Sequence, residues 1–231
     1  MDIDSLLQFD SNLLLSLNGS NSQFVDGWMM TLTTGYTWIP LYIALFYLIV
    51  KNSETMGQIA LVVACTGLCL LLADGGADGI AKPLVARFRP CNDPVIGSMV
   101  STVDNYRASG LYGFFSAHAA NTASIALFFS LLVRSNLLSV SLLIWSLINC
   151  YTRIYLGVHY PLDVFVGIIW GLCTGGIAYA VYYRMRRFLS KSNNFISDHY
   201  TSTGFCTEDI DVVILTLIVT LIYTIIRAVY A

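Results

Sequence analysis

Six long apolar runs constrain the fold of this chain more than any other feature of its sequence. They cover residues 33–50, 57–80, 115–134, 136–157, 161–183 and 210–229. A helix needs about 20 mostly apolar residues to cross the hydrocarbon core of a bilayer, and each run is close to that length. Only 11% of the 231 residues are charged, whereas a typical soluble domain carries about 25%. The sequence therefore predicts an all-α fold, an integral membrane six-transmembrane-helix bundle.

The N-terminal segment has a different pattern. Leucines fall near one face of a helix, with acidic and amide residues opposite, and the pattern ends at Asn18 and Gly19. These leucines are Leu6, Leu7, Leu13, Leu14 and Leu17. An amphipathic helix of this kind typically lies in the membrane interface, and a seventh short span is the alternative. We expect residues 1–231 to form a single membrane-embedded domain, with residues 1–30 as its interfacial N-terminal segment.

Six spans would place loop 81–114 and the loop between the fourth and fifth runs on the side that holds both termini. Lys and Arg favour cytoplasmic loops, but each side carries six cations, so a count does not decide the orientation. One side has Lys51, Arg134, Arg184, Arg186, Arg187 and Lys191, and the other has Lys82, Arg87, Arg89, Arg107, Arg153 and Arg227. The cluster at 184–187 ends a span directly, and several cations of the second group look functional. We therefore expect an inner-membrane protein in which the side that carries the second group of cations faces the periplasm or outside.

The stretch KPLVARFRP contains two cations, Lys82 and Arg89, seven residues apart. Seven residues are nearly two turns of a helix, so both side chains would share one face. Pro90 is expected to stop that helix, because proline restricts the residue before it. Arg offers a planar fork and Lys a point charge, which together suit an anion. Binding of lipid headgroups is the alternative role for this pair.

The stretch FSAHAANTASIA opens the third apolar run. Ser116 stands where an N-cap belongs, and good helix formers follow it. Free backbone N–H groups and the positive end of the helix dipole make such a start an anion site. His118 falls in the first turn, close to anything bound there, although an ordinary cap beside an interfacial histidine is the alternative.

The stretch TRIYLGVHYPLD, residues 152–163, separates the fourth and fifth runs. Pro161 suits the first turn of the fifth helix. His159 and Asp163 are four residues apart, a spacing that lets a carboxylate hold one ring nitrogen while the other faces a substrate. Arg153 ends the fourth run on the same side. A structural salt bridge between Arg153 and Asp163 is the alternative interpretation.

The predicted topology brings all three stretches, which lie within residues 82–163, to one membrane face. Ionisable groups at membrane depth point to a functional site. Three cations, a helix N-terminus, two histidines and a carboxylate fit phosphoryl transfer, which needs charge neutralisation, a nucleophile and an acid for the leaving oxygen. Asp74, Asp78 and Arg107 lie near these stretches; Asp78 could pair with Lys82, and their roles stay open.

Together the three motifs resemble the type-2 phosphatidic acid phosphatase family, a family of membrane lipid phosphatases with the signatures K-x6-R-P, P-S-G-H and S-R-x5-H-x3-D. The first signature matches fully from Lys82 to Pro90. The second keeps Ser and His but has Phe115 for Pro and Ala117 for Gly. The third differs only in Thr152, which replaces Ser. The match covers the middle of the chain, and the six-span layout fits the membrane members.

The resemblance implies a role for each matched residue. His159 would be the nucleophile that forms a phosphohistidine, Asp163 would orient it, and His118 would be the general acid. The phosphate would be held by Lys82, Arg89, Ser116, Ala117 and Arg153. The family implies no metal or other cofactor, because its fixed protein cations do the work that metal ions do in other phosphatases.

The resemblance also limits the substrate to the phosphate of a membrane lipid. Related enzymes act on undecaprenyl pyrophosphate, lipid A, phosphatidylglycerophosphate and phosphatidic acid, and we favour undecaprenyl pyrophosphate or lipid A phosphate. A non-catalytic carrier of anionic lipid is the alternative of another class, and it would need no nucleophile. The net charge of −2 gives no basic surplus for a nucleic acid partner, and the sequence does not indicate an oligomeric state.

Overall fold

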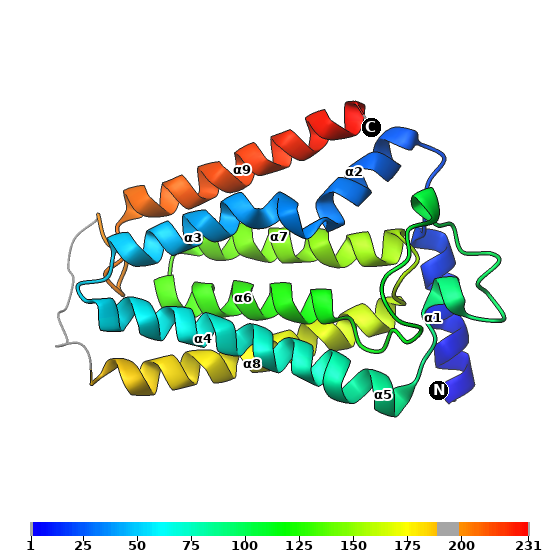
Figure 1. Ribbon diagram of the computed structural model, residues 1–231, viewed down its shortest axis with the longest axis horizontal. Helices are drawn as coiled ribbons and strands as arrows, with labels where there is room; N and C mark the ends of the chain where they lie inside the picture. Colours follow the sequence, from blue (N-terminus) through cyan, green and yellow to red (C-terminus); the bar gives the residue numbers. More distant parts are fainter. Residues whose placement is uncertain (1, 189–198, 231) are drawn as a thin grey trace.

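The computed structural model describes residues 2–188 and 199–230, and in these two ranges it forms helices and loops without a β-strand (Figure 1). The α-helices are α1 (Ile3–Leu17), α2 (Gln23–Thr33), α3 (Ile39–Lys51), α4 (Met56–Asp74), α5 (Lys82–Val85), α6 (Ala117–Val133), α7 (Asn136–Tyr155), α8 (Pro161–Arg186) and α9 (Thr207–Val229). Single 3-10 turns cover Gly35–Trp38, Pro90–Asn92 and Val103–Asn105. A π-helical segment, Gly75–Ala81, joins α4 to α5. The predicted all-α fold is confirmed.

The described residues contain four helices that are long and apolar enough to cross a membrane: Met56–Val85, Asn136–Tyr155, Pro161–Arg186 and Thr207–Val229. A fifth candidate is α2 together with Gly35–Lys51, although this pair is bent by 67°. The helix α6 is apolar but has only 17 residues. The chain is therefore a membrane protein with four or five candidate spans by length and composition, and the number six stays a prediction.

The long helices form a bundle in which α6 lies between α4, α7 and α8 (Figure 1). Three glycines of α8, Gly167, Gly171 and Gly175, allow the contact with α6. A Cβ atom at these positions would lie 2.4 to 2.6 Å from backbone carbonyl oxygens of α6. Small residues let two membrane helices approach this closely. The contact also sets the N-termini of α6 and α8 side by side, because the backbone N–H of Ser116 donates to the carbonyl of Asp163 at 3.0 Å.

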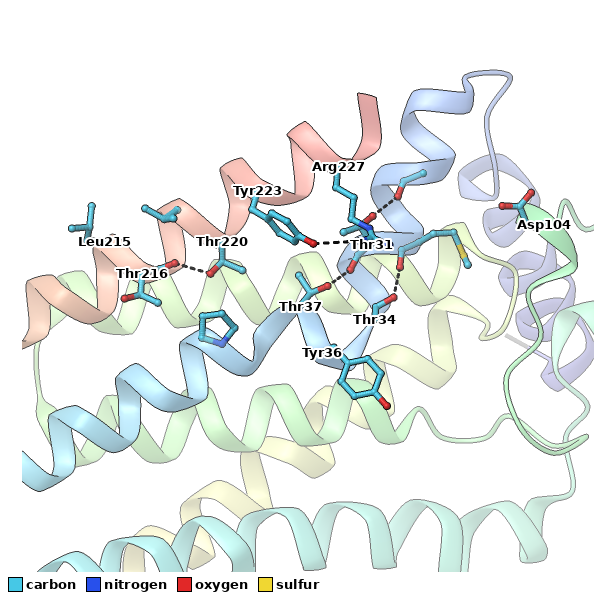
Figure 2. A pocket seen from close by; sticks show the side chains of 14 residues that line it. Thr31, Thr34, Tyr36, Thr37, Asp104, Leu215, Thr216, Thr220, Tyr223 and Arg227 are labelled. Atoms are coloured by element: carbon cyan, nitrogen blue, oxygen red, sulfur yellow. Dashed lines mark hydrogen bonds between the residues drawn. The ribbon is translucent and has the colours of Figure 1, made fainter. Parts of the chain in front are cut away.

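The bend between α2 and α3 opens a groove of about 920 Å³ against α9 (Figure 2). Several threonines line it, and their hydroxyl groups donate to backbone carbonyls, as Thr31 does to Gly27 and Thr220 to Thr216. None of the eight predicted site residues lines it, so the groove is separate from the expected phosphate site.

The helix α1 lies across the end of the bundle that carries loops 86–116 and 156–160 (Figure 1). The Asn18 side chain donates to the carbonyls of Tyr155 and Ser101, and Gly19 N–H donates to Tyr155. On the face of α1 that carries acidic and amide residues, Asp10 is 3% exposed. Residues 23–30 of the expected interfacial segment are part of α2, which packs on α7 and α9. Lys191 of the expected cytoplasmic cluster lies outside the described residues.

Candidate active site

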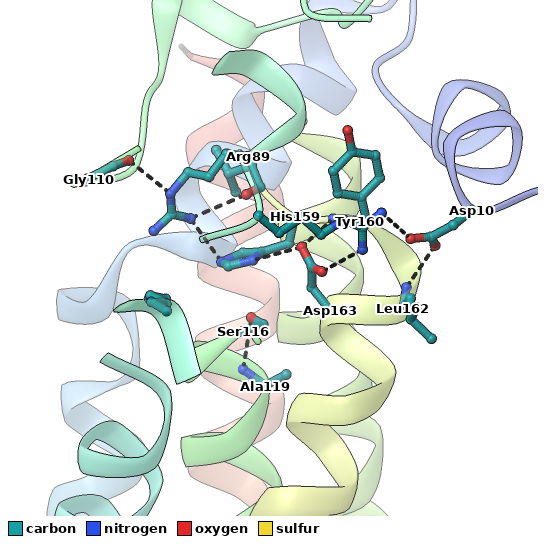
Figure 3. Close-up of polar contacts among 12 residues, drawn as sticks. Asp10, Arg89, Gly110, Ser116, Ala119, His159, Tyr160, Leu162 and Asp163 are labelled. Carbon is teal, nitrogen blue, oxygen red and sulfur yellow. Dashed lines mark hydrogen bonds and ion pairs between the residues drawn. The ribbon is translucent and has the colours of Figure 1, made fainter. Parts of the chain in front are cut away.

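The predicted site residues come from separate elements and meet at the end of the bundle next to α1. Figure 3 shows Arg89 on the loop after α5 pointing to His159, with Asp163 at the start of α8 and Ser116 at the start of α6. The loop that carries His159 is short, and the N–H groups of Val158 and His159 both donate to the carbonyl of Arg153 at 3.2 Å. The end of α7 therefore fixes the position of the histidine.

Arg89 is 3% exposed and makes its contacts inside the site. Its Nη1 atom lies 3.0 Å from Nε2 of His159, and its other N–H groups donate to the carbonyls of Ser109, Gly110 and Val158. A guanidinium has donors but no acceptor. Nε2 of His159 must therefore accept this hydrogen bond, which places the proton of the neutral ring on Nδ1.

Asp163 is fully buried and faces the other side of the His159 ring. Its Oδ2 lies 3.7 Å from Nδ1 of His159, which is too long for a hydrogen bond. Oδ2 accepts from the N–H of Tyr160 at 3.1 Å and so caps α8, while Oδ1 accepts from Arg87 at 2.9 Å. The alternative salt bridge from Arg153 to Asp163 is not among the ion pairs of the described residues, and Arg87 occupies that place.

The charge state of His159 follows from its surroundings. The side chain is 2% exposed, and burial together with the positive charges of Arg153, Arg89 and Lys82 lowers the pKa of His159 well below its usual value. Burial disfavours the charged form of a histidine, and nearby cations do the same. The imidazole is therefore neutral near pH 7, which is the form that has a lone pair for attack.

Arg153 ends α7 and is 1% exposed. Its Nη1 atom donates to the hydroxyls of Thr33 at 2.5 Å and Tyr106 at 3.1 Å. Its Nε has no hydrogen-bond partner within the described part of the chain. A buried guanidinium surrounded by neutral hydroxyls keeps its full positive charge available for an anion. Nothing in the sequence around Thr33 or Tyr106 singles them out as neighbours of Arg153.

Lys82 and Arg89 were expected on one face of a single helix, but the helix that begins at Lys82 ends before Arg89. The helix α5 ends at Val85 because Ala86 has a left-handed conformation, with φ of 50°. Lys82 and Arg89 therefore do not share a face of one helix, and the expectation that Pro90 stops that helix is wrong. Lys82 instead forms an ion pair with Asp78, and its charge still acts on His159.

Ser116 forms the predicted N-cap of α6, where its hydroxyl accepts from the N–H of Ala119 at 3.4 Å. Ser116 and Ala117 are buried, whereas His118 in the first turn is exposed. The positive charges of Arg153, Lys82 and Arg89 act on His118, so it lies beside the same site.

Asp74 and Arg107 lie near the site and contact neighbouring polar side chains. Asp74 accepts a hydrogen bond from the Asn121 amide of α6 at 2.8 Å, a polar contact between neighbouring helices. Arg107 is exposed on the loop and reaches Asn92 at 3.5 Å. Within residues 2–188 and 199–230, no group of three or more His, Cys, Asp or Glu side chains is placed to hold a metal ion. Arg89, Arg153 and Lys82 contribute positive charge at the site.

This arrangement suits a tetrahedral anion. Arg89, Arg153 and Lys82 offer three positive charges around a neutral imidazole, and the N-terminus of α6 adds backbone N–H groups. A phosphoryl group in this position would meet a nucleophile on one side. His118, in the first turn of α6, is exposed at the same end of the helix.

Comparison with known proteins agrees with this chemistry. Residues 55–187, more than half of the chain, match the model of the PAP2 superfamily. A lipid A 4'-phosphatase of Bacteroides thetaiotaomicron is 36% identical over 184 residues, which cover 79% of this chain and 81% of the relative. A lipid A 4'-phosphatase of Porphyromonas gingivalis is 35% identical over 193 residues, which cover 82% and 80%.

The fold also resembles a solved structure. The crystal structure of LpxE from Aquifex aeolicus matches with a TM-score of 0.55 and 23% identity, over 73% of this chain and 93% of that one. This likeness concerns the fold, and the sequence matches carry the assignment. The chain is therefore a hydrolase of the phosphatase type, and it belongs to the PAP2 superfamily.

Proposed function

We propose that this chain removes a phosphate from lipid A, or from a closely related membrane lipid, through a phosphohistidine intermediate on His159. One observation carries the proposal: a buried, neutral imidazole has its Nε2 atom directed at the guanidinium of Arg89, among three cations. Two relatives at 35–36% identity are lipid A 4'-phosphatases. Their names favour lipid A over undecaprenyl pyrophosphate, the other substrate expected from the sequence.

In the first step, the phosphate oxygens bind Arg89, Arg153 and Lys82 and the backbone N–H groups near Ala117 at the start of α6. Arg89 transfers its Nη1 donor from His159 to the phosphate, and the Nε2 lone pair becomes free. Nε2 attacks phosphorus while the bond to the lipid oxygen breaks. His118, in its protonated form, donates its proton to that oxygen.

In the second step, water hydrolyses the phosphohistidine. His118 is now neutral and takes a proton from the water, whose oxygen attacks phosphorus as the P–N bond breaks. The products are inorganic phosphate and the original imidazole. Asp163 stabilises the positive charge on the His159 ring in both transition states, because its carboxylate faces the protonated Nδ1 atom.

The proposal includes a topology. The bent pair α2–α3 and the short helix α6 both count as crossings, which gives six spans and brings loops 86–116 and 156–160 to one side. That side faces the periplasm, because the cluster Arg184, Arg186 and Arg187 ends α8 at the opposite end of the bundle. The helix α1 lies in the interface on the periplasmic side, next to the site.

A panel of phosphate-release assays tests the function. Protein purified in detergent with EDTA is given lipid A, undecaprenyl pyrophosphate, phosphatidylglycerophosphate and phosphatidic acid, and released phosphate is measured. We expect the highest kcat/KM with lipid A, and no release from any substrate by His159→Ala. A wild-type protein that binds these lipids but releases no phosphate would show a carrier. Higher kcat/KM for another lipid would overturn the substrate, and loss of activity in EDTA would contradict a metal-free mechanism.

Trapping of the intermediate tests the mechanism separately. Wild-type protein is mixed with 32P-labelled substrate, quenched in base, which preserves phosphohistidine, and analysed by peptide mapping. We expect label on the peptide that contains His159 and none in His159→Ala. Label elsewhere, or an active His159→Ala variant, would exclude His159 as the nucleophile.

A further inference from the structure

The N-terminal helix α1 contributes a buried carboxylate to the edge of the candidate site. Asp10 is 3% exposed, whereas most other polar side chains of α1 are exposed. Figure 3 shows Asp10 pointing from α1 toward the start of α8, beside Leu162 and Asp163. The charged group lies on the protein-facing side of a helix whose sequence suggests only a surface anchor.

Arg87 connects this carboxylate to Asp163. Its Nη2 atom lies 2.7 Å from Oδ2 of Asp10, and its Nη1 atom lies 2.9 Å from Oδ1 of Asp163. The guanidinium is stacked on the ring of Tyr160, with its Cζ atom 3.7 Å from the ring centroid. A planar guanidinium can bind two carboxylates in one fixed geometry, which the single charge of a lysine cannot.

Asp10 has a second contact that fixes its orientation. Its Oδ1 accepts the N–H of Leu162 at 2.9 Å, which is one of the first N–H groups of α8 and has no partner within that helix. Burial raises the pKa of Asp10, and the hydrogen bond from Arg87 opposes that shift. Asp10 therefore binds both Arg87 and the helix that carries Asp163.

We propose that Arg87 and Asp10 are positioning residues that hold the Asp163 carboxylate against His159 during phosphoryl transfer. Both oxygens of Asp163 are engaged, Oδ1 by Arg87 and Oδ2 by the N–H of Tyr160. The carboxylate plane is therefore fixed, with Oδ2 facing Nδ1 of His159. Loss of the Asp10 carboxylate leaves Nη2 of Arg87 without its partner. Loss of the Arg87 guanidinium leaves Oδ1 of Asp163 without its hydrogen bond and removes the cation that balances the charge of Asp163.

This inference rests on the proposed function, since it assigns Asp163 to stabilising the charged His159 ring. It predicts a change in the kinetic constants that neither misfolding nor loss of a substrate contact would produce. Neither Arg87 nor Asp10 is placed to touch the phosphate, so KM should hold while kcat falls. A misplaced group near the reacting atoms can lower the rate by about 10²-fold.

The test is a double-mutant cycle in purified protein, with lipid A as substrate. We expect kcat about tenfold lower in Asp10→Asn and in Arg87→Lys, about 100-fold lower in Arg87→Met, and KM within about twofold of wild type. Because Asp10 and Arg87 hold the same carboxylate, the loss of kcat in the double variant Asp10→Asn with Arg87→Met should be smaller than the two single losses combined. The matched controls are Asp4→Asn, an exposed acid on α1, and Arg107→Gln, an exposed loop cation, and both should retain wild-type kcat.

Each other outcome has a defined meaning. The melting temperature and the elution profile in detergent identify variants that misfold. If Arg87→Met misfolds, Arg87→Lys still tests the proposal, because lysine keeps the positive charge and much of the side-chain volume. The proposal is wrong if kcat is unchanged in folded Asp10→Asn and Arg87→Lys, if KM rises instead, or if the two losses simply add. Absence of phosphate release by wild type and by both controls would instead sink the proposed function itself.

Discussion

Nη1 of Arg89 lies 3.0 Å from Nε2 of His159 and donates to it, so the lone pair of the proposed nucleophile is engaged before substrate arrives. A phosphate oxygen is the stronger acceptor for a guanidinium, because the hydrogen bond is then assisted by two opposite charges. Binding of the phosphate and release of the nucleophile would therefore be one event. This couples reactivity to occupancy and protects the imidazole from other electrophiles.

The first prediction concerns Arg89. We expect Arg89→Lys to lower kcat/KM by about 10²–10³-fold, because lysine keeps the charge but loses the planar fork. Arg89 also holds the carbonyls of Ser109 and Gly110, so the thermal stability should fall as well. Steady-state kinetics and a melting curve in detergent measure both effects, and Arg107→Gln serves as the control. Unchanged kcat/KM would show that Arg89 does not bind the phosphate.

The second prediction concerns His118 as the general acid. An acid is needed most when the leaving oxygen is a poor leaving group. His118→Gln should therefore abolish most activity on a lipid phosphate but much less on p-nitrophenyl phosphate, whose phenolate leaves without a proton. Equal losses on both substrates would assign His118 to phosphate binding instead. The matched histidine control is His199→Gln. His199 lies between α8 and α9, at the end of the bundle opposite the candidate site, and the variant should behave like wild type.

The third prediction concerns the contact that sets α8 against α6. A Cβ at Gly171 would lie 2.4 Å from the carbonyl oxygen of Ala120, which is backbone and cannot move away easily. We expect Gly171→Ala to destabilise the protein by about 1–3 kcal/mol, in the range of other overpacking changes. A Cβ at Gly176 on the same helix would have no other atom within 4 Å, so Gly176→Ala should not destabilise the protein. Equal melting temperatures for the two variants would contradict the close packing.

The fourth prediction concerns orientation in the membrane. Cys91 is 8% exposed and is a poor target for a thiol reagent, so exposed positions at the two ends of the bundle are better probes. We expect a membrane-impermeant maleimide to label Arg107→Cys in intact spheroplasts and Glu54→Cys only after permeabilisation. Background labelling is removed by replacing the exposed Cys173 and the half-buried Cys206 with Ser. The opposite pattern would place the site in the cytoplasm.

The sequence could predict much of the fold from local chemistry. Apolar runs of sufficient length must be helices in a bilayer, because only a helix satisfies all its own backbone groups there. The run expected at 136–157 is α7, Asn136–Tyr155, and the run at 161–183 begins at Pro161 as expected. The bend after Thr33 and the left-handed Ala86 interrupt apolar or helical patterns, and hydrophobic periodicity does not mark such breaks.

The site divides in the same way. Signature spacing alone singled out His159, Asp163 and Arg89, because each motif is short and its residues are held by one local segment. Arg87 lies inside the first motif, two residues before Arg89. A further cation at that place could have been predicted to belong to the site, but the motif spacing does not include it. Thr33 and Tyr106 offered no signal, since neither residue type is unusual in its position.

Residues close together in the chain were enough to predict the membrane setting, the helical class and the short segments that carry the proposed site residues. Only the tertiary structure decided which groups meet across the bundle. Asp163 pairs with Arg87, 76 residues away, rather than with Arg153, and Asp10 reaches Leu162 over 152 residues. Such pairings depend on how closely α6 and α8 pack and on where α1 lies, and neither follows from any local pattern.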